Sequence, residues 1–589
     1  MMLGAKRINI LDLPAEVLFH IFSIVKFDSP FDLDGLHYFE NLTQNTSDIK
    51  SLRLVCRTFA STCNPLLLPV VSCSLLDPEA TDINKLEKIS QNGDFSSSVR
   101  VVHVRLGFYD PVIAASLGNL ALYLSWAWEE FVTEQHGIPF GRVSKIVRGW
   151  TLENQTDYES LQILRPIYNE YKRRYLLQLE LHRSGSALRR LAQAMARMPA
   201  ATRLVLDDEQ PCASSRLGPL MLASLGKAYG PNYDDLSCLA APMSWLDCWQ
   251  LKTKFDRSPF DECRPPIDIL INLPVMIHRA GIRLTGFRVL NLQIPSYVPA
   301  WDMLDRAEEM ADPVDLAKPA ELIEACRSLK VLEITPEYWL GGCMRSGGKY
   351  MAAAHNRSCF SWPVRDPTRR LRPWTLFFDI VRCMLSETLR QIHLDSPILP
   401  FNPIIEGFWP PSLDLHFEFD FGQRMFADHP TPDLEVLHLS NTDIGVPFGL
   451  GALLRGAGRL REVRLSDVQV GPLASLDGHP SEDGWAWLIQ VLREVFPRMY
   501  QNWSATGSSR SDVVPSANLV LLEHISWMEY TGSPTRLETL AKSLFEDKLD
   551  HGFTAVENYI RGAADINPLV EAYERYPVDD WDNYSTFAF

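Results

Sequence analysis

A glycine-rich stretch at residues 342–350 comes closest to a nucleotide-binding motif in this chain. It contains Gly342, Gly347, Gly348 and Lys349. In a phosphate-binding loop, backbone N–H groups and such a lysine hold the phosphates, and a following Ser or Thr holds magnesium. Here the glycine spacing is one residue too long, and Tyr350 stands where the Ser or Thr is needed. We therefore interpret the stretch as a surface loop.

Several cysteines and one histidine are candidate zinc ligands by residue type. Cys343, His355 and Cys359 lie in one stretch of sequence, as do Cys238 and Cys248, but the chain has no Cys-x-x-Cys pair. A zinc site needs three or four ligands that include close pairs. The motifs Gly-x-Ser-x-Gly and His-Glu-x-x-His are also missing from the sequence. We expect structural thiols, no metal, no cofactor and no enzyme activity. A pocket with converging polar groups would reopen a hydrolytic function.

The composition predicts a folded protein with more than one structural part. Of 589 residues, 46% are apolar and 22% are charged, and one simple core rarely holds so long a chain. The net charge of −16 argues against nucleic acid as a partner, since phosphate contacts need clustered Lys and Arg. The sequence has neither a secretory signal nor a membrane-length apolar run. We expect a protein of the cytoplasm, the nucleus or both, without a membrane partner.

Two amphipathic helices are predicted near the N-terminus. Pro14 suits the first turn of the first helix, where its missing N–H costs nothing. One apolar stripe follows, made of Val17, Leu18, Ile21, Phe22 and Val25. A second helix is predicted to begin near Ser47 and to stop at Pro65. Neither stripe can be buried by its own helix, so the two helices must pack together and on something else.

The residues of these helices resemble the F-box. The resemblance covers about residues 8–71, and its most specific part is Leu-Arg-Leu-Val-Cys-Arg-x-Phe at residues 52–59. It implies a compact three-helix module that docks on the Skp-type adaptor of a cullin–RING ubiquitin ligase, while the rest of the chain holds a protein substrate. The overall style is similar to F-box proteins of filamentous fungi. Motif positions implied to meet the adaptor are Leu13, Pro14, Ile21, Leu52, Val55 and Cys56.

Two questions about this module, residues 8–75, stay open in the sequence. The motif residues could simply form its core, which is favoured for Ile21 and Phe59, whereas contact with the adaptor is favoured for Leu13 and Pro14. Residues 26–46 form an insertion longer than the usual link, and it could permit or block adaptor binding. The alternative function is therefore a non-ligase interaction scaffold in which the helices act as a structural cap.

The body, residues 76–575, repeats a pattern of two alternating apolar residues with a third apolar residue three positions earlier. One such unit cannot bury its own strand, but stacked units form a parallel sheet lined by helices. The pattern resembles leucine-rich repeats. Its instances are Val99-x-x-Val102-x-Val104, Phe287-x-x-Leu290-x-Leu292, Leu329-x-x-Leu332-x-Ile334, Leu389-x-x-Ile392-x-Leu394, Leu434-x-x-Leu437-x-Leu439, Leu460-x-x-Val463-x-Leu465 and Leu522-x-x-Ile525-x-Trp527.

Departures from the regular repeat define the predicted fold class. The polar turn residue of regular repeats is missing, and the spacing between instances varies widely. We predict an α/β protein in which a small all-α F-box module precedes an irregular leucine-rich-repeat-like solenoid. The alternative is an α/β body of unrelated helix–strand units. Residues 207–217 are predicted to be a loop, and residues 576–589 a tail.

Side chains on the outward positions of the predicted strands are the candidate substrate-binding surface. In a solenoid these positions line the concave face, where partners commonly bind. Their mixed charges favour a protein ligand, although plain solvation is the simpler interpretation. The candidates are Glu333, Thr335, His393, Asp395, His438, Ser440, Arg464 and Ser466. Scattered tryptophans, Trp126, Trp128, Trp150, Trp245 and Trp249, are expected in the core.

Overall fold

The computed structural model divides the chain into two units. It describes residues 10–27, 46–75, 82–134, 142–150, 158–208, 213–227, 236–245, 247–248, 251, 266, 268–290, 319–335, 381, 383–395, 431–440, 443–444, 448–466, 468–470, 473–474, 480–482, 484–505, 520–523, 526–527, 556 and 558–566. Unit 1 comprises residues 1–325 and 337–377, and unit 2 comprises residues 326–336 and 378–589. The predicted glycine-rich loop, the thiols near it, Trp249 and the C-terminal tail lie outside the described residues.

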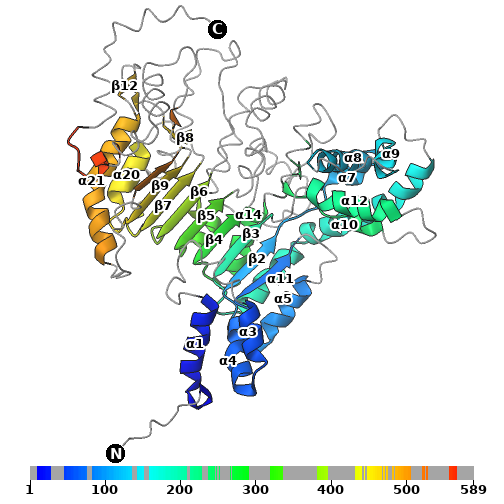
Figure 1. Ribbon diagram of the computed structural model, residues 1–589, viewed down its shortest axis with the longest axis horizontal. Coiled ribbons are helices and arrows are strands. Elements are labelled where there is room, and N and C mark those ends of the chain that lie inside the picture. Colours follow the sequence, from blue (N-terminus) through cyan, green and yellow to red (C-terminus); the bar gives the residue numbers. More distant parts are fainter. Residues whose placement is uncertain are drawn as a thin grey trace, which may run out of the picture. The chain divides into compact units, whose positions relative to one another are not determined.

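Unit 1 begins with three mutually packed helices, which we call the N-terminal module (Figure 1). They are α1 (Ala15–Phe27), α3 (Thr46–Arg53) and α4 (Arg57–Leu67), and a 3-10 turn, η1 (Ile10–Asp12), precedes them. Apolar side chains from all three helices form one core, made of Leu18, Phe22, Ile49, Phe59, Cys63 and Leu66. The rings of Phe22 and Phe59 meet edge to face, with centroids 4.8 Å apart.

The prediction of one continuous second helix is wrong, because the structure has two helices there, α3 and α4. The N–H groups of Leu54 and Val55 bond carbonyls only three residues back, which closes α3. Cys56 then has extended backbone angles, and its Sγ accepts a hydrogen bond from the Phe59 N–H at 3.4 Å. This thiol cap begins α4. Pro65 lies inside α4 rather than ending it.

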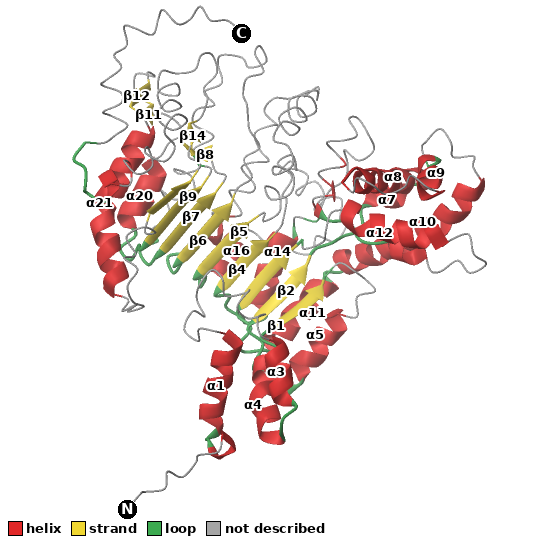
Figure 2. Ribbon diagram, viewed as in Figure 1, coloured by secondary structure: helices red, strands yellow, loops and turns green. Residues whose placement is uncertain are grey.

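A four-stranded parallel sheet follows in unit 1. Its order is β1 (Val70–Ser74), β2 (Val101–Arg105), β3 (Arg203–Asp207) and β4 (Gly286–Leu290). Figure 2 shows helices beside these strands, and neighbouring helices pack on each other. These helices are α5 (Asp82–Gln91), α6 (Gly93–Ser96), α11 (Ser186–Ala196) and α14 (Ile269–Arg279). Helix precedes strand each time, as the sequence pattern predicted.

Two long insertions between the strands of unit 1 form what we call the helical lobe. The first lies between β2 and α11, and the second between β3 and α14. Their elements are α7 (Pro111–Ala115), α8 (Leu117–Glu134), α9 (Arg142–Arg148), α10 (Tyr158–Arg183), α12 (Ala213–Lys227) and η3 (Leu236–Leu239). Helix α12 packs along α8, so the insertions cover each other. The predicted loop at 207–217 is therefore wrong in part, because α12 begins at Ala213.

Unit 2 contains five parallel strands in the order β5, β6, β7, β9, β13. Their bounds are β5 (Val331–Thr335), β6 (Gln391–Asp395), β7 (Val436–Ser440), β9 (Glu462–Ser466) and β13 (Val520–Glu523). Helices α20 (Phe448–Gly456) and α21 (Gly484–Ala505) pack together, and α16 (Pro319–Cys326) precedes β5 in sequence. Short strands complete the unit: β8 (Asp443–Ile444), β10 (Gln469–Val470) and β14 (Ser526–Trp527) are parallel, and β11 (Leu473–Ala474) and β12 (Pro480–Glu482) are antiparallel.

Strand registers test the seven instances of the pattern. Five fall on β2, β5, β6, β7 and β9 as predicted. The other two instances are out of register. Phe287 was predicted as the first position of its pattern, but it pairs with Leu204, which pairs with Val102, the second position in β2. The pattern of β4 therefore begins three residues earlier, at Leu284. Leu522 pairs with Leu465 and occupies the last position instead of the first. Strands β1 and β3 were missed, although Leu68-x-x-Val71-x-Cys73 and Ala201-x-x-Leu204-x-Leu206 fit the same pattern in register with β2. The chain is thus a mixed α/β protein with parallel sheets and many helices.

Candidate functional site

Helix α1 carries two apolar stripes. Leu18 and Phe22 are buried in the core of the N-terminal module. Val17 and Ile24 lie more than a quarter turn away from that stripe at 100° per residue, and their exposed fractions are 42% and 43%. Ile21 lies between the buried stripe and the exposed stripe, and it is half-buried. The second stripe is not needed for the module's own core.

The turn between α3 and α4 adds two more exposed apolar side chains. Leu54 is 86% exposed and Val55 is 63% exposed. Ile10 and Leu11, before α1, are each nearly half exposed. Of the thirteen large apolar side chains recorded as exposed among the described residues, eight belong to this module: Ile10, Leu11, Val17, Phe19, Ile24, Val25, Leu54 and Val55. Exposed apolar side chains are thus concentrated in this one small module.

The six predicted adaptor-binding residues divide into two groups. Pro14 and Val55 are exposed. Leu13, Ile21, Leu52 and Cys56 are half-buried and pack against the module's core. The structure thus brings all six to one module, with Phe59 fully in its core. The sequence-based list omitted the most exposed apolar residue, Leu54, although Leu54 lies next to Val55 in the motif.

A buried lysine closes the α1 end of the module. Lys26 is fully buried, and its Nζ donates to Thr46 Oγ1 at 2.6 Å. Burial, and after it the nearby Lys50 charge, lower the pKa of Lys26 to about 8. The two ends of the predicted insertion, at residues 26 and 46, therefore meet. Residues 28–45 lie outside the described part of the chain.

Four strands of unit 2 align a row of charged and imidazole side chains. Glu333, His393, His438 and Arg464 are successive partners in the strand register. Glu333 Oε1 lies 3.8 Å from His393 Nδ1, and the two imidazole rings meet edge to face at 5.3 Å. The next row contributes Glu462, whose Oε1 lies 2.9 Å from His438 Nε2 and 2.7 Å from Arg464 Nε.

The expectation that this row is solvent-lined is wrong for several of its members. Glu333, Thr335 and His438 are buried, while His393, Ser440 and Ser466 are half-buried and Arg464 is exposed. Asp395 lies in β6 in register with Ser440. The sequence missed Glu462. Burial alone would raise its pKa, but the hydrogen bond with His438 and the neighbouring charges lower it below the ordinary value. Ion pairing within the row therefore competes with ligand binding.

Three strands of unit 1 bring together a serine, a histidine and an aspartate. Ser72 on β1 pairs in register with His103 on β2, and Asp207 lies on the adjacent β3. Ser72 Oγ lies 3.0 Å from His103 Nδ1, and His103 Nε2 lies 2.8 Å from Asp207 Oδ2. His103 and Asp207 are buried, whereas Ser72 is exposed. These residues are far apart in sequence, so no local motif predicted this arrangement.

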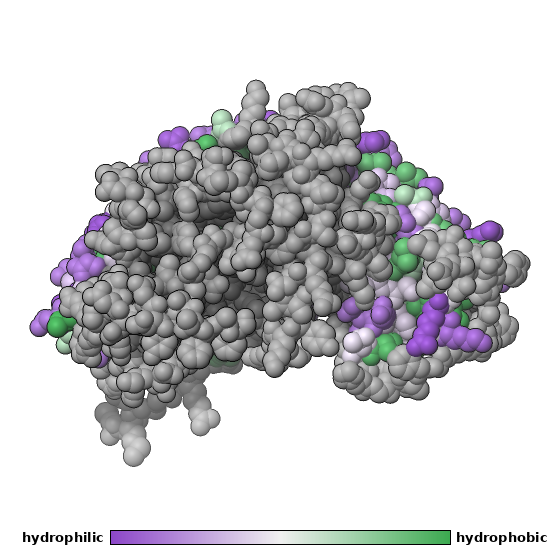
Figure 3. All heavy atoms as spheres, turned by 90° about the horizontal axis from the view of Figure 1, so that it is seen from above, coloured by the Kyte–Doolittle hydropathy of each residue, from purple (hydrophilic) through white to green (hydrophobic). Residues whose placement is uncertain are grey.

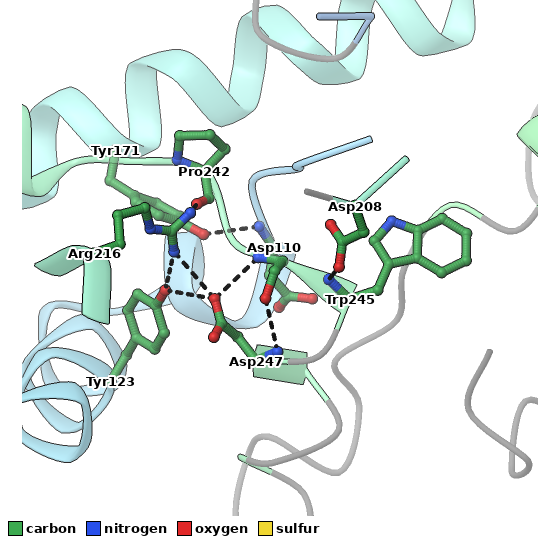
Figure 4. A network of polar contacts seen from close by, with 9 residues as sticks. Asp110, Tyr123, Tyr171, Asp208, Arg216, Pro242, Trp245 and Asp247 are labelled. Carbon is green, nitrogen blue, oxygen red and sulfur yellow. Dashed lines mark hydrogen bonds and ion pairs between the residues drawn. The ribbon is translucent and has the colours of Figure 1, made fainter. Parts of the chain in front are cut away.

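The helical lobe is held by a buried polar network (Figure 4). The Arg216 guanidinium on α12 lies 3.1 Å from Asp247 Oδ2 and 3.2 Å from the Tyr123 hydroxyl on α8, and also donates to the Pro242 carbonyl. Burial first, and then the Asp247 carboxylate, raise the pKa of Tyr123 well above its ordinary value. Asp247 also accepts from the Ser244 N–H at 3.0 Å. This network joins both insertions, so its first role is structural.

The lobe also buries Trp126, Trp128, Trp150 and Trp245, as expected for core tryptophans. Trp245 donates from Nε1 to the Leu106 carbonyl at 3.1 Å, and Asp208 accepts from its backbone N–H. In Figure 3, hydrophilic and hydrophobic side chains are intermixed where described residues are visible at the side of the lobe. The visible part of the lobe therefore presents no large continuous apolar area.

Within the described ranges, no three His, Cys, Asp or Glu side chains are grouped to hold a metal ion. No described helix has both the length and the apolar character of a membrane span. Comparison of the sequence with protein-family models and with curated proteins gave no match.

Proposed function

We propose that this chain is the substrate-recognition subunit of a Skp-cullin-F-box type ubiquitin ligase. The observation that carries the proposal is the concentration of exposed apolar side chains on the N-terminal module, beside the residues that resemble the F-box. The module already has a complete core, with three helices packed around Phe22 and Phe59. Its additional apolar surface, which includes Leu54 and Val55, is then available for the Skp-type adaptor, and the adaptor brings the cullin.

The energetics favour contact through the exposed turn. Burying one large aliphatic side chain is worth about 1.5–3 kcal/mol. Leu54 and Val55 are the most exposed large apolar residues of the module. They make little contribution to its core, so association can bury them without loss of folding contacts. Pro14 and Val17 offer a second contact on α1.

The body supports the receptor part of the proposal. The parallel strands within each unit and the helices that precede several of them support an irregular leucine-rich-repeat-like solenoid. The strand face of unit 2 would hold a protein substrate through Arg464, His393 and their neighbours. The chain would promote ubiquitin transfer by holding the substrate close to the loaded partner, without bond chemistry of its own in this role. Such a role belongs to the cytoplasm, the nucleus or both.

A pull-down with purified Skp-type adaptor tests the proposal. The variant Leu54→Asp/Val55→Asp places two charges in the exposed turn, and we expect at least about a tenfold loss of affinity from one desolvated charge alone. Leu13→Ala/Pro14→Ala tests the α1 contact. The matched control is Leu176→Asp/Leu177→Asp, a pair of adjacent exposed leucines on α10. The proposal would be overturned if the folded wild type did not bind the adaptor. It would also be overturned if both aspartate double variants bound the adaptor with equal affinity.

The alternative is a non-ligase scaffold in which the module caps the body. Its supporting observation is that α4 packs against α6 in unit 1. Deleting residues 1–68, which stops short of β1, separates the two functions. A cap predicts that the remaining chain loses its cooperative unfolding transition, whereas a docking module predicts that the transition survives.

A further inference from the structure

We propose that Ser72, His103 and Asp207 form a nucleophilic site that hydrolyses carboxylic esters. This inference is independent of the ligase proposal, since it concerns the strand face of unit 1. It rests on three side chains from adjacent strands that are joined by two hydrogen bonds. A serine, a base in contact with it and a group that orients the base are the elements of an activated nucleophile.

The hydrogen bonds determine which proton His103 can move. Asp207 has an acceptor-only carboxylate when ionised, so the proton of the neutral imidazole belongs on Nε2, 2.8 Å from Asp207 Oδ2. Nδ1 then carries the lone pair and faces the Ser72 hydroxyl at 3.0 Å. His103 is therefore oriented to accept the serine proton. Serine hydrolases usually use the opposite nitrogens, but either imidazole nitrogen can act as the base.

Solvent exposure increases from the orienting carboxylate to the nucleophile, as catalysis requires. Asp207 and His103 are 3% and 4% exposed, while Ser72 is exposed to solvent. A buried carboxylate holds the imidazole firmly, because few rotamers are open to it. The nucleophile remains accessible on the open strand face.

The edge of the sheet offers a hydrogen-bond donor for the developing oxyanion. The Val101 N–H bonds the Pro69 carbonyl, and the Leu75 N–H bonds the Arg105 carbonyl. Pro69 and Leu75, which flank β1, therefore turn their backbone groups toward β2. In a parallel ladder every second residue does so, which means that the backbone groups of Ser72 face the opposite edge. Strand β1 is the first strand of the sheet order. The Ser72 N–H can therefore contribute to stabilising negative charge on a substrate oxygen.

The reaction balances without a cofactor. Ser72 Oγ forms a bond to the ester carbonyl carbon while its proton passes to His103 Nδ1. The C–O bond to the alcohol breaks, and His103 returns the proton to the departing alcohol. Water then attacks the acyl-serine with the same proton transfers, which releases the carboxylic acid and restores Ser72.

A fluorophosphonate probe on the full chain tests this site, with the modified residue located by peptide mass spectrometry and p-nitrophenyl acetate hydrolysis measured in parallel. We expect an adduct on Ser72 and an initial burst of p-nitrophenol. Ser72→Ala should abolish both, and the matched control Ser74→Ala, on the same strand and face, should preserve both. His103→Gln should slow labelling about 100-fold or more, the usual range for a general base.

Asp207 is a positioning residue, and its variants need a separate readout. Asp207→Asn removes the anion that holds the Nε2 proton, and we expect labelling of Ser72 to slow while the circular dichroism spectrum stays unchanged. Asp207→Glu should restore part of the rate. Equal labelling of Ser72 and Ser74, or no labelling of the folded wild type, would overturn the proposal. Full labelling in folded Asp207→Asn or His103→Gln would do so as well.

Discussion

The N-terminal module and the helical lobe are both all-helical parts of unit 1, yet they distribute polarity in opposite ways. The core cluster of the module is apolar, with Lys26 as its one buried charge among the described residues, and Leu54 and Val55 stay exposed. The lobe pairs Arg216, which is 14% exposed, with the fully buried Asp247 carboxylate. Exposed apolar side chains are expected where another protein docks, and buried charges where the chain must adopt one arrangement. The difference is what we expect if, as we propose, the module is the surface that a partner covers.

Replacing the lobe's buried arginine should have the largest effect. Arg216→Met leaves the Asp247 carboxylate, which has no exposed surface, without its cation. Removing one partner of a buried pair costs about 3–5 kcal/mol. We expect a corresponding fall in the free energy of unfolding, measured by urea titration, with adaptor affinity unchanged. A loss below about 1 kcal/mol, the level of a surface pair, would remove the contrast between the two regions.

The module should separate stability from binding. Leu18→Ala removes a fully buried core side chain and should cost about 2–5 kcal/mol. Leu54→Ala changes an exposed residue and should alter the free energy of unfolding by less than about 0.5 kcal/mol. The adaptor affinity should respond to Leu54→Ala in the folded protein. If Leu54→Ala destabilised the module as much as Leu18→Ala, the exposed turn would be a folding element instead.

The smallest predicted effect is a pH dependence within the module. Because the pKa of Lys26 is lowered to about 8 in the folded state, the unfolded chain binds more protons between pH 8 and the ordinary lysine value of 10.5. The stability contributed by this site should therefore rise with pH across that window, and should be constant below it.

Comparison of Lys26→Met with the wild type isolates this contribution. The wild type should gain stability on the order of 1 kcal/mol relative to the variant as pH rises from 8 to 10. Denaturant titrations at each pH provide the measurement, and Lys88→Met, which replaces an exposed lysine on α5, serves as the control. Parallel pH curves for wild type and Lys26→Met would show that Lys26 does not titrate in the folded module.

The sequence by itself determined the elements that depend on local spacing. The stripe of α1 follows from apolar residues at helical intervals, and β5, β6, β7 and β9 follow from alternating apolar residues after a fixed entry position. Its two register errors, at Phe287 and Leu522, arose because several apolar residues fit the same template. Strand β1 also alternates, with Val71 and Cys73 buried, but it follows the N-terminal helices directly and was read as part of an apolar run.

Only the tertiary structure decided which distant residues meet and which of them are covered. His103 and Asp207 are 104 residues apart, and their contact depends on the pairing of β2 with β3. Burial of Glu333 and His438 likewise depends on what packs over the strand face, which the alternation within a strand cannot specify. The lobe network needs both insertions to fold together. Local periodicity predicts a face, but the neighbours across that face come from elsewhere in the chain.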